Sequence, residues 1–236
     1  MGIIGRFDKI DERGRGEVYL HEKKIIAFVL VLSLLVFLLP RNEGKAKMLT
    51  KTLSISEEAL SSPVVTVGKS TWDCIYYGNY WQNDTNGDGI ADTNDSKERI
   101  KWRVLSVDGN DAFLMSDQAL DFKRNSDNNR SEAWATCYLR EWLNSTFYDV
   151  AFSKTEKDSI ISTTIENDIG GSTIDNVYML STSEASNTEY GFDKSFSDES
   201  ETRIASNTTY CALRDYDAGF QYVKESIPTV WWTRTT

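Results

Sequence analysis

The hydrophobic pattern divides this chain into one long apolar run near the N-terminus and a series of short alternating segments after it. Residues 25–39 are apolar apart from Ser33, follow a lysine pair and end at Pro40. As a helix these 15 residues span about 22 Å, which is less than the hydrocarbon core of about 30 Å. The length favours a cleaved signal peptide, whereas the lack of a clean small-x-small cleavage site favours an uncleaved signal anchor. Both interpretations place the rest of the chain outside the cytoplasm.

The run sets the expected organisation of the chain. Residues 1–24 are interpreted as a cytoplasmic n-region, although their mixed charge and lack of an apolar period also fit a start-site artefact. A buried core helix at residues 25–39 is disfavoured because the run is apolar all round and directly follows two lysines. We therefore expect residues 25–40 to be a signal or transmembrane segment, 41–62 a polar linker, and 63–236 one extracytoplasmic domain.

Short alternating or aromatic segments within the domain predict β-strands, because side chains alternate between the two faces of a strand. The sequence Asp-Gly-Asn-Asp at residues 108–111 predicts a hairpin turn between two of them. The expected strands cover residues 64–67, 72–77, 101–107, 112–115, 177–180 and 229–233.

Helices are expected mainly in the middle of the domain. Ser131 can cap a helix that ends at Asn144 and carries Ala135, Leu139, Trp142 and Leu143 on one face. Capping boxes are expected at two further helix starts, formed by Ser153 with Glu156 and by Ser181 with Glu184. Strands, then helices, then strands predict an α+β fold with antiparallel strands and two or three short helices.

An acidic loop between two predicted strands has the residue spacing of a calcium site. Calcium prefers oxygen ligands, and Gly89 occupies the sixth position of the loop, where a sharp turn is needed. The candidate ligands at positions 1, 3, 5, 7, 9 and 12 are Asp84, Asn86, Asp88, the backbone carbonyl of Ile90, Asp92 and Asp95. Because Asp95 replaces the longer glutamate of sensor proteins, we expect a dissociation constant of about 10⁻⁴ to 10⁻³ M. The alternative is a solvated turn that binds no ion.

Composition narrows the classes of partner and of reaction. Residues 48–236 contain 17 basic and 30 acidic side chains, a net charge of −13, which disfavours nucleic acid and anionic lipid as partners. The membrane is therefore expected to be contacted only through the N-terminal segment. The single histidine, His21, precedes the apolar run, so a Ser-His-Asp triad or a histidine-ligated zinc site is excluded from the domain.

Two further questions stay open at this point. A glycan hydrolase needs only two carboxylates, and no catalytic pair stands out among the acidic residues. The odd number of cysteines, Cys74, Cys137 and Cys211, does not predict a disulfide.

The order of several aromatic motifs resembles a known family. These motifs are residues 72–82, 100–105 and 134–144, with Trp231-Trp232-Thr233-Arg234 at the end. They resemble bacterial secreted and surface domains of unassigned function that carry a Trp-Trp-Leu-Arg-Ser-Pro-Gly motif near the C-terminus. The resemblance implies a C-type-lectin-like fold of the formylglycine-generating-enzyme type. Because the chain stops where family members continue, the resemblance also implies a truncated copy of reduced stability.

The expected function is that of an exported, calcium-stabilised surface domain, membrane-anchored or secreted, which acts in ligand recognition or adhesion. A glycan or a surface protein is the candidate partner, and Tyr76, Tyr77, Tyr80 and Trp81 are candidate platforms for sugar rings. Trp72, Trp102, Trp134 and Trp142 are interpreted as core residues, and Arg234 as half of a structural ion pair. The alternatives are a carboxylate-based glycan hydrolase and a purely structural domain of a cell-surface assembly.

Overall fold

The computed structural model describes residues 4–8, 59–66, 69–125, 132–195, 200–217, 228–229, 231 and 233–235. The expected signal or transmembrane segment, most of the linker and the Ser131 cap lie outside these residues. In the part of the chain that is described, no helix is both long and apolar enough to cross a membrane. The described residues from Leu60 onward form one compact unit together with Ile4–Asp8.

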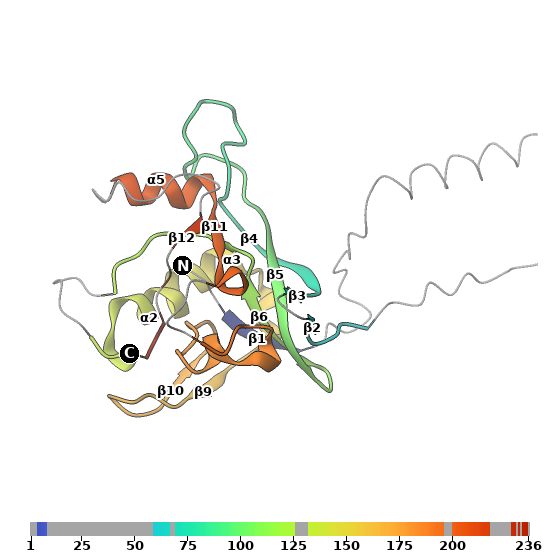
Figure 1. Ribbon diagram of the computed structural model, residues 1–236. Helices are drawn as coiled ribbons and strands as arrows, with labels where there is room; N and C mark the ends of the chain where they lie inside the picture. Colours follow the sequence, from blue (N-terminus) through green and yellow to red (C-terminus); the bar gives the residue numbers. More distant parts are fainter. Residues whose placement is uncertain are drawn as a thin grey trace, which may run out of the picture. The chain divides into compact units, whose positions relative to one another are not determined.

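A five-stranded antiparallel sheet forms the centre of this unit (Figure 1). The predicted hairpin is present, with Asp108 opposite Asp111 and Gly109 in the left-handed region at φ 59°. In spatial order the strands are β4 (Cys74–Tyr80), β5 (Glu98–Asp108), β6 (Asp111–Ser116), β1 (Ile4–Asp8) and β8 (Ile160–Ile161).

Strand β5 shows how the alternating pattern produces the core. Ile100, Trp102 and Val104 are buried, whereas the side chains between them are partly exposed. A register shift against β6 follows Val104, and Leu105 is buried as well. This is the effect of a β-bulge, which adds one residue to one strand and turns the next side chain to the same face.

Strand β1 lies within the segment expected to be an n-region. Its five residues pair with β6 from Ile4 opposite Met115 to Asp8 opposite Asp111, and Arg6 and Phe7 also pair with β8. A five-residue strand is too short to show a convincing apolar period, so the sequence pattern did not reveal it.

Smaller sheets surround the central one. Only the pairing of β11 with β7 is parallel among the strand pairs described. These sheets are β2 (Val64–Thr66) with β3 (Lys69–Thr71), β9 (Thr163–Ile165) with β10 (Thr173–Asp175), and β12 (Pro228–Thr229), β11 (Ala205–Asn207) and β7 (Gln118–Ala119).

The expected strand at residues 177–180 is buried throughout, but it contains only a single β-bridge residue, Tyr178, and no continuous strand. Other groups satisfy its carbonyls: the Asn144 amide donates to Val177, and Arg234 donates to Met179 and Leu180. The hydrophobic pattern thus predicted burial correctly, while partners from distant segments took the place of a neighbouring strand.

The helices gather in the middle of the chain, as expected, but the first begins later and continues further than predicted. Asn144 does not end it, because its side chain donates to the Arg140 carbonyl and accepts from the amides of Asn176 and Val177, while the backbone continues through a π-helical turn. The segments are η1 (Trp134–Thr136), α2 (Tyr138–Trp142), η2 (Leu143–Phe147), α3 (Tyr148–Ala151) and α4 (Lys154–Asp158).

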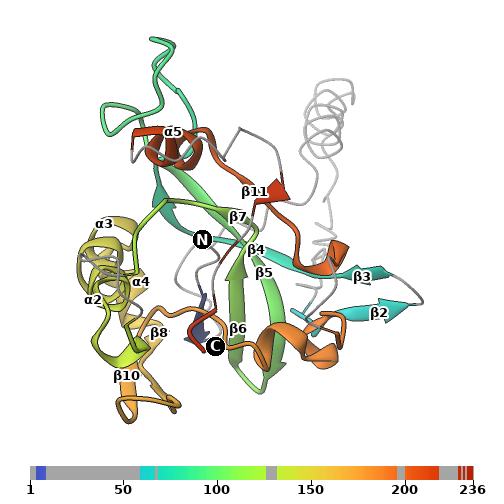
Figure 2. The ribbon, with the colours of Figure 1, turned by 60° about the vertical axis from the view of Figure 1, so that its left-hand side comes forward.

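Further short helices follow along the chain: η3 (Glu184–Ser186), η4 (Thr188–Tyr190), η5 (Glu201–Arg203) and α5 (Thr209–Asp217). The capping box at α4 is confirmed, since Ser153 Oγ accepts from the Glu156 amide and Glu156 Oε2 accepts from the Ser153 amide. Helices α2, α3 and α4 lie together beside the sheet, and α5 lies apart from them (Figure 2).

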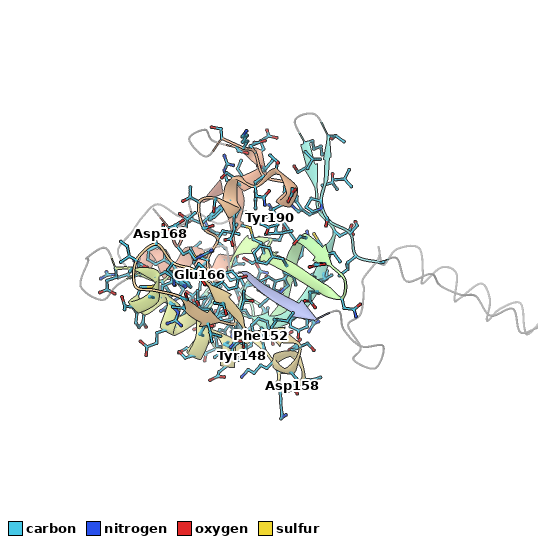
Figure 3. The ribbon with its side chains drawn as sticks, turned by 90° about the horizontal axis from the view of Figure 1, so that it is seen from below. Tyr148, Phe152, Asp158, Glu166, Asp168 and Tyr190 are labelled. Atoms are coloured by element: carbon cyan, nitrogen blue, oxygen red, sulfur yellow. The ribbon has the colours of Figure 1, made fainter. Side chains whose placement is uncertain are left out.

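Aromatic side chains fill the contact between the helices and the sheet. Trp102, Trp134 and Trp142 are buried and Trp72 packs against the core, which confirms their expected core role. Tyr148 and Phe152 lie together under the sheet, with ring centroids 5.9 Å apart (Figure 3). The observed architecture is mixed α and β, with largely antiparallel sheets and short helices.

Candidate functional site

The acidic loop, residues 84–95, extends away from the sheet between β4 and β5 and lies near α5 (Figures 1 and 2). Its base is fixed by Gln82, a buried residue whose side-chain amide donates to the carbonyls of Glu98 and Arg99. The Tyr210 amide, at the start of α5, donates to the Gln82 carbonyl at 3.0 Å. The sheet and α5 therefore hold the loop at its base.

Within the loop, side-chain oxygens accept hydrogen bonds from nearby backbone amides. Asp84 accepts from Gly87 at 2.6 Å and from Gly89 at 2.7 Å, and both glycines have positive φ. Asn86 accepts from the Asp88 amide, and Asp88 accepts from the amide of Ile90. Such Asx turns fold the chain tightly, and the sharp turn expected at Gly89 is confirmed by its φ of 90°.

Asp95 closes the loop from its buried end. Its Oδ1 accepts from the amides of Thr85 and Asn86 at 2.7 and 3.0 Å, and its Oδ2 accepts from the Asp92 amide at 2.8 Å. These amides, that of Asp92 first, hold the pKa of the Asp95 carboxyl below its usual range because they stabilise the charged form. Asp95 therefore joins the first and last thirds of the loop through hydrogen bonds to their backbone amides.

The donor chemistry of the loop suits calcium, since all the candidate ligands are oxygens within twelve residues. Asp88 and Ile90 are exposed and Asp84 and Asp92 half-buried. Among the described residues, no three His, Cys, Asp or Glu side chains converge closely enough to hold a metal ion. Both carboxylate oxygens of Asp84 and of Asp95 already accept from loop amides. Calcium binding stays a prediction, and it requires the exposed oxygens to draw together.

The C-terminal motif forms a structural ion pair. Arg234 Nη1 and Nη2 donate to the two carboxylate oxygens of Glu184 at 2.5 and 3.2 Å, and Nη1 also donates to the Met179 carbonyl. The Arg234 side chain is only 7% exposed, and its guanidinium lies 5.7 Å from the centre of the Tyr178 ring. The expected structural role of Arg234 is confirmed.

Glu184 also fulfils its predicted capping role. The Ser181 amide donates to Glu184 Oε2 at 2.7 Å, and the Glu184 amide donates to Ser181 Oγ at 3.1 Å. One carboxylate thus caps a helical turn and binds Arg234.

Other C-terminal residues are anchored as well. Trp231 Nε1 donates to the Arg203 carbonyl, and Thr235 Oγ1 accepts from the Thr182 amide. The strand expected at residues 229–233 is therefore replaced by the short β12 and by these contacts, and Trp232 lies outside the described residues.

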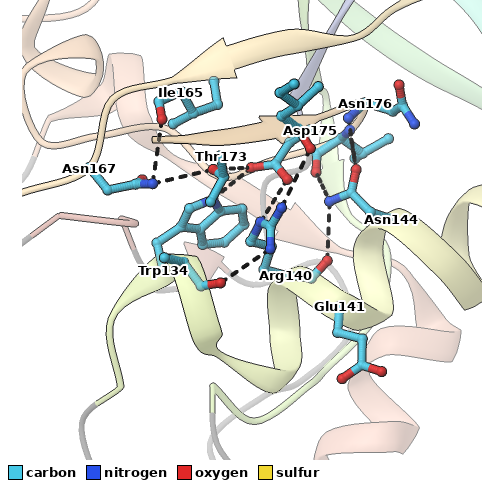
Figure 4. A network of polar contacts seen from close by, with 12 residues as sticks. Trp134, Arg140, Glu141, Asn144, Ile165, Asn167, Thr173, Asp175 and Asn176 are labelled. Atoms are coloured by element: carbon cyan, nitrogen blue, oxygen red, sulfur yellow. Dashed lines mark hydrogen bonds and ion pairs between the residues drawn. The ribbon is translucent and has the colours of Figure 1, made fainter. Parts of the chain in front are cut away.

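A buried polar network around Asp175 joins α2 to β10 (Figure 4). The Asp175 carboxylate accepts from Arg140 Nε at 2.7 Å, from Trp134 Nε1 at 2.9 Å and from Thr173 Oγ1 at 2.8 Å. Asp175 is 1% exposed, so all its charge compensation comes from the protein. Glu141, which follows Arg140 in α2, points away from this network (Figure 4). No sequence spacing indicates the pair, because Arg140 and Asp175 are far apart in the chain.

Asp121 forms a second buried site with Tyr80. The Tyr80 hydroxyl donates to Asp121 Oδ2 at 2.7 Å, and Lys123 Nζ lies 3.9 Å from the same oxygen. Burial raises the pKa of both the Asp121 carboxyl and the Tyr80 hydroxyl, because the charged form of each loses its hydration. The site is compact and joins β4 to the segment after β7.

The aromatic residues considered as sugar platforms differ in exposure. Tyr77 and Tyr80 are buried, so the interpretation of these two as surface platforms is wrong. Trp81 is half-buried and stacks on Tyr210, with ring centroids 5.9 Å apart. Tyr76, in contrast, is 37% exposed. Residues at the end of β4 turn inward because α3, α5 and the adjacent helical turn cover that part of the strand.

Comparison with known families matches residues 109–236 to a domain of unknown function, DUF6273. The match covers more than half of the chain. The chain belongs to the DUF6273 family. The matched residues include the Asp175 network and the Arg234–Glu184 ion pair, whereas the acidic loop precedes them. No curated protein and no solved structure matches this chain.

Proposed function

We propose that this DUF6273 domain is a calcium-stabilised extracytoplasmic module that acts in ligand recognition or adhesion. The acidic loop carries the proposal: its ligand spacing is complete, its glycines adopt the required turns, and Asp95 holds its ends together. The ion is assigned to the side-chain oxygens of Asp84, Asn86, Asp88, Asp92 and Asp95 and to the backbone carbonyl of Ile90. The millimolar calcium outside cells suits such a weak site.

Calcium titration of the full-length protein tests this proposal. Trp81 is a suitable fluorescent reporter, because it precedes the loop and stacks on Tyr210 at the loop base. We expect a saturable fluorescence change and a heat of binding with a dissociation constant of about 10⁻⁴ to 10⁻³ M. Asp88→Ala should remove both signals, whereas Asp158→Ala, a change to an exposed aspartate outside the loop, should leave them intact. Equal binding by the two variants would show that the loop is not the site.

The resemblance to C-type-lectin-like domains supports a glycan as the ligand. A glycan array probed with the full-length protein, with calcium and with a chelator, tests this assignment. Calcium-dependent binding that Asp88→Ala abolishes is expected. An experimental structure with a different topology from C-type-lectin-like domains would remove this support.

A purely structural role in a surface assembly is the second candidate, and one observation favours it. Two of the four aromatic residues considered for sugar stacking are buried, so their rings stabilise the core and do not contact a ligand. Calcium binding without any signal on the glycan array would favour this role. A hydrolase has less support, since the buried carboxylates of Asp121 and Asp175 are bound to Tyr80 and Arg140 respectively.

A further inference from the structure

Strand β1 occupies an interior position in the central sheet. It lies between β6 and β8, with all five of its residues in register with β6 and two in register with β8. Removing it would leave the backbone groups of β6 without their partners on that side and would separate β8 from the sheet. Exposed strand edges of this kind pair readily with other chains.

The strands beside β1 belong to the hydrophobic core. Phe113, Leu114 and Met115 of β6 and Ile160 of β8 are buried, and they stand opposite β1 residues in the register. Without β1, these buried residues of β6 and β8 would be more exposed to solvent. The N-terminal strand is therefore part of the domain that begins again at Leu60.

This connection constrains the apolar run. Ile4–Asp8 and the residues from Leu60 onward belong to one unit, so the chain between them must cross a membrane an even number of times. Residues 25–39 are the only long apolar run in this interval and number 15. Two helical crossings would need about 40 apolar residues. The number of crossings that agrees with the sheet is therefore zero.

Charge next to the run agrees with this conclusion. Lys23 and Lys24 precede the run, and Arg41, Lys45 and Lys47 follow it. A single-crossing anchor is oriented by an excess of basic residues on one side. Here both ends of the run carry basic residues, so the charges do not favour placing the two ends on opposite sides of a membrane.

We infer that β1 is an integral strand of the domain, and that Ile4–Asp8 and the described residues from Leu60 onward lie on the same side of the membrane. On this inference, no membrane separates β1 from the rest of the sheet. This inference goes beyond the proposed function and bears on it, because it removes the apolar run as the argument for an extracytoplasmic location, and that location is therefore tested separately below.

An engineered disulfide tests the strand pairing in the full-length protein. In a Cys74→Ser background, which removes the exposed native thiol, Asp8→Cys is combined with Asp111→Cys, its partner in the register. Both substitutions are at strand ends, so the variant should fold. Asp8→Cys with Asp108→Cys is the matched control, since Asp108 lies one strand further away. Adjacent strands are about 4.8 Å apart, so that pair exceeds the limit of about 7 Å for a disulfide.

We expect rapid oxidation of the first pair to an intramolecular disulfide, seen as a gel mobility shift and a cross-linked peptide by mass spectrometry. The control pair should stay reduced. Failure of the first pair to oxidise in folded protein, or equal oxidation of both pairs, would overturn the inference.

Labelling with a membrane-impermeant maleimide tests the sidedness in intact cells. Gly2→Cys and Thr236→Cys are made separately in the same Cys74→Ser background. Equal labelling of the two cysteines supports the inference and agrees with an extracytoplasmic location. Protection of the two cysteines until the cells are permeabilised also supports the inference, but it contradicts the extracytoplasmic proposal. Labelling of position 236 with protection of position 2 would overturn the inference and leave the proposed function standing. A mature protein that lacks residues 1–8 would also overturn it.

Discussion

The acidic loop and the Asp175 network both depend on aspartate carboxylates, but they satisfy them in opposite ways. Asp175 is bound by Arg140 and Trp134, which come from elements distant in sequence. The loop carboxylates accept mainly from backbone amides a few residues away. The network is thus a product of the tertiary fold, whereas the loop organises itself locally and leaves oxygens near the solvent.

The difference in burial gives the two regions different energetic roles. Loss of the Asp175 carboxylate leaves the buried Trp134 Nε1 without an acceptor and the Arg140 charge without its counter-ion, which is costly. Loss of an exposed loop carboxylate allows water to replace it. The network should therefore matter for folding under all conditions, and the loop mainly when a ligand is present.

The largest expected effect is that of Asp175→Ala. Because it leaves Arg140 Nε and Trp134 Nε1 without their acceptor, we expect the free energy of unfolding to fall by about 3 to 5 kcal/mol. Urea denaturation of the full-length protein measures this change. Asp158→Ala is the matched control, since Asp158 is 68% exposed and its pair with Lys154 contributes less than about 1 kcal/mol. Similar losses in both variants would remove the proposed contrast between buried and exposed aspartates.

Calcium should stabilise the wild-type protein by about 2.7 kcal/mol when free calcium is 100 times the dissociation constant. Asp88→Ala should abolish this increase while changing the calcium-free protein little, because Asp88 is exposed. Asp95→Asn, in contrast, should lower stability even in chelator, because Asp95 closes the loop. Thermal melting in calcium and in chelator measures both effects. A wild-type melting temperature that is the same in both would contradict the calcium proposal.

Removal of the C-terminal ion pair by Arg234→Ala should cost about 1.5 to 3 kcal/mol, the range for hydrogen bonds to charged groups. Arg234→Lys keeps the charge but cannot donate to both oxygens of Glu184 as Arg234 does, so it should recover only part of the loss. Urea denaturation of the two variants makes the comparison. Full recovery by lysine would mean that charge, rather than the two-pronged geometry, holds the C-terminal residues.

The smallest effects should appear in the pH dependence. Asp95 has a lowered pKa in the folded protein, so its contribution is present above the unfolded value of about 3.9 and is lost as the pH falls through the folded pKa. Asp121 has a raised pKa, so acidification through that pKa stabilises the folded state. Urea midpoints are measured across this pH range. Asp121→Asn should remove the gain in stability on acidification, and Asp95→Asn should remove the loss of stability at low pH. A profile that neither substitution alters would contradict both assignments.

Prediction from sequence succeeded where local rules were sufficient. Alternation placed β5 and β6, and the Ser-x-x-Glu spacing located the capping box at Ser153 and the reciprocal hydrogen bonds between Ser181 and Glu184. It failed where distant groups replaced local partners. Residues 177–180 are buried without forming a strand, and the helix continues past Asn144 because residues 176–177 bind that side chain.

By itself, the sequence determined the mixed α and β class, the aromatic core, the acidic loop with its turns, and the pairing role of Arg234. These features depend on periodicity, on backbone preferences and on the cost of burying an unpaired charge, all of which act residue by residue. Only the tertiary structure decided that Asp175 meets Arg140, that Glu184 receives Arg234, and that Ile4–Asp8 lies between β6 and β8. Contacts between residues so far apart depend on how the entire chain excludes water, and no local spacing records them.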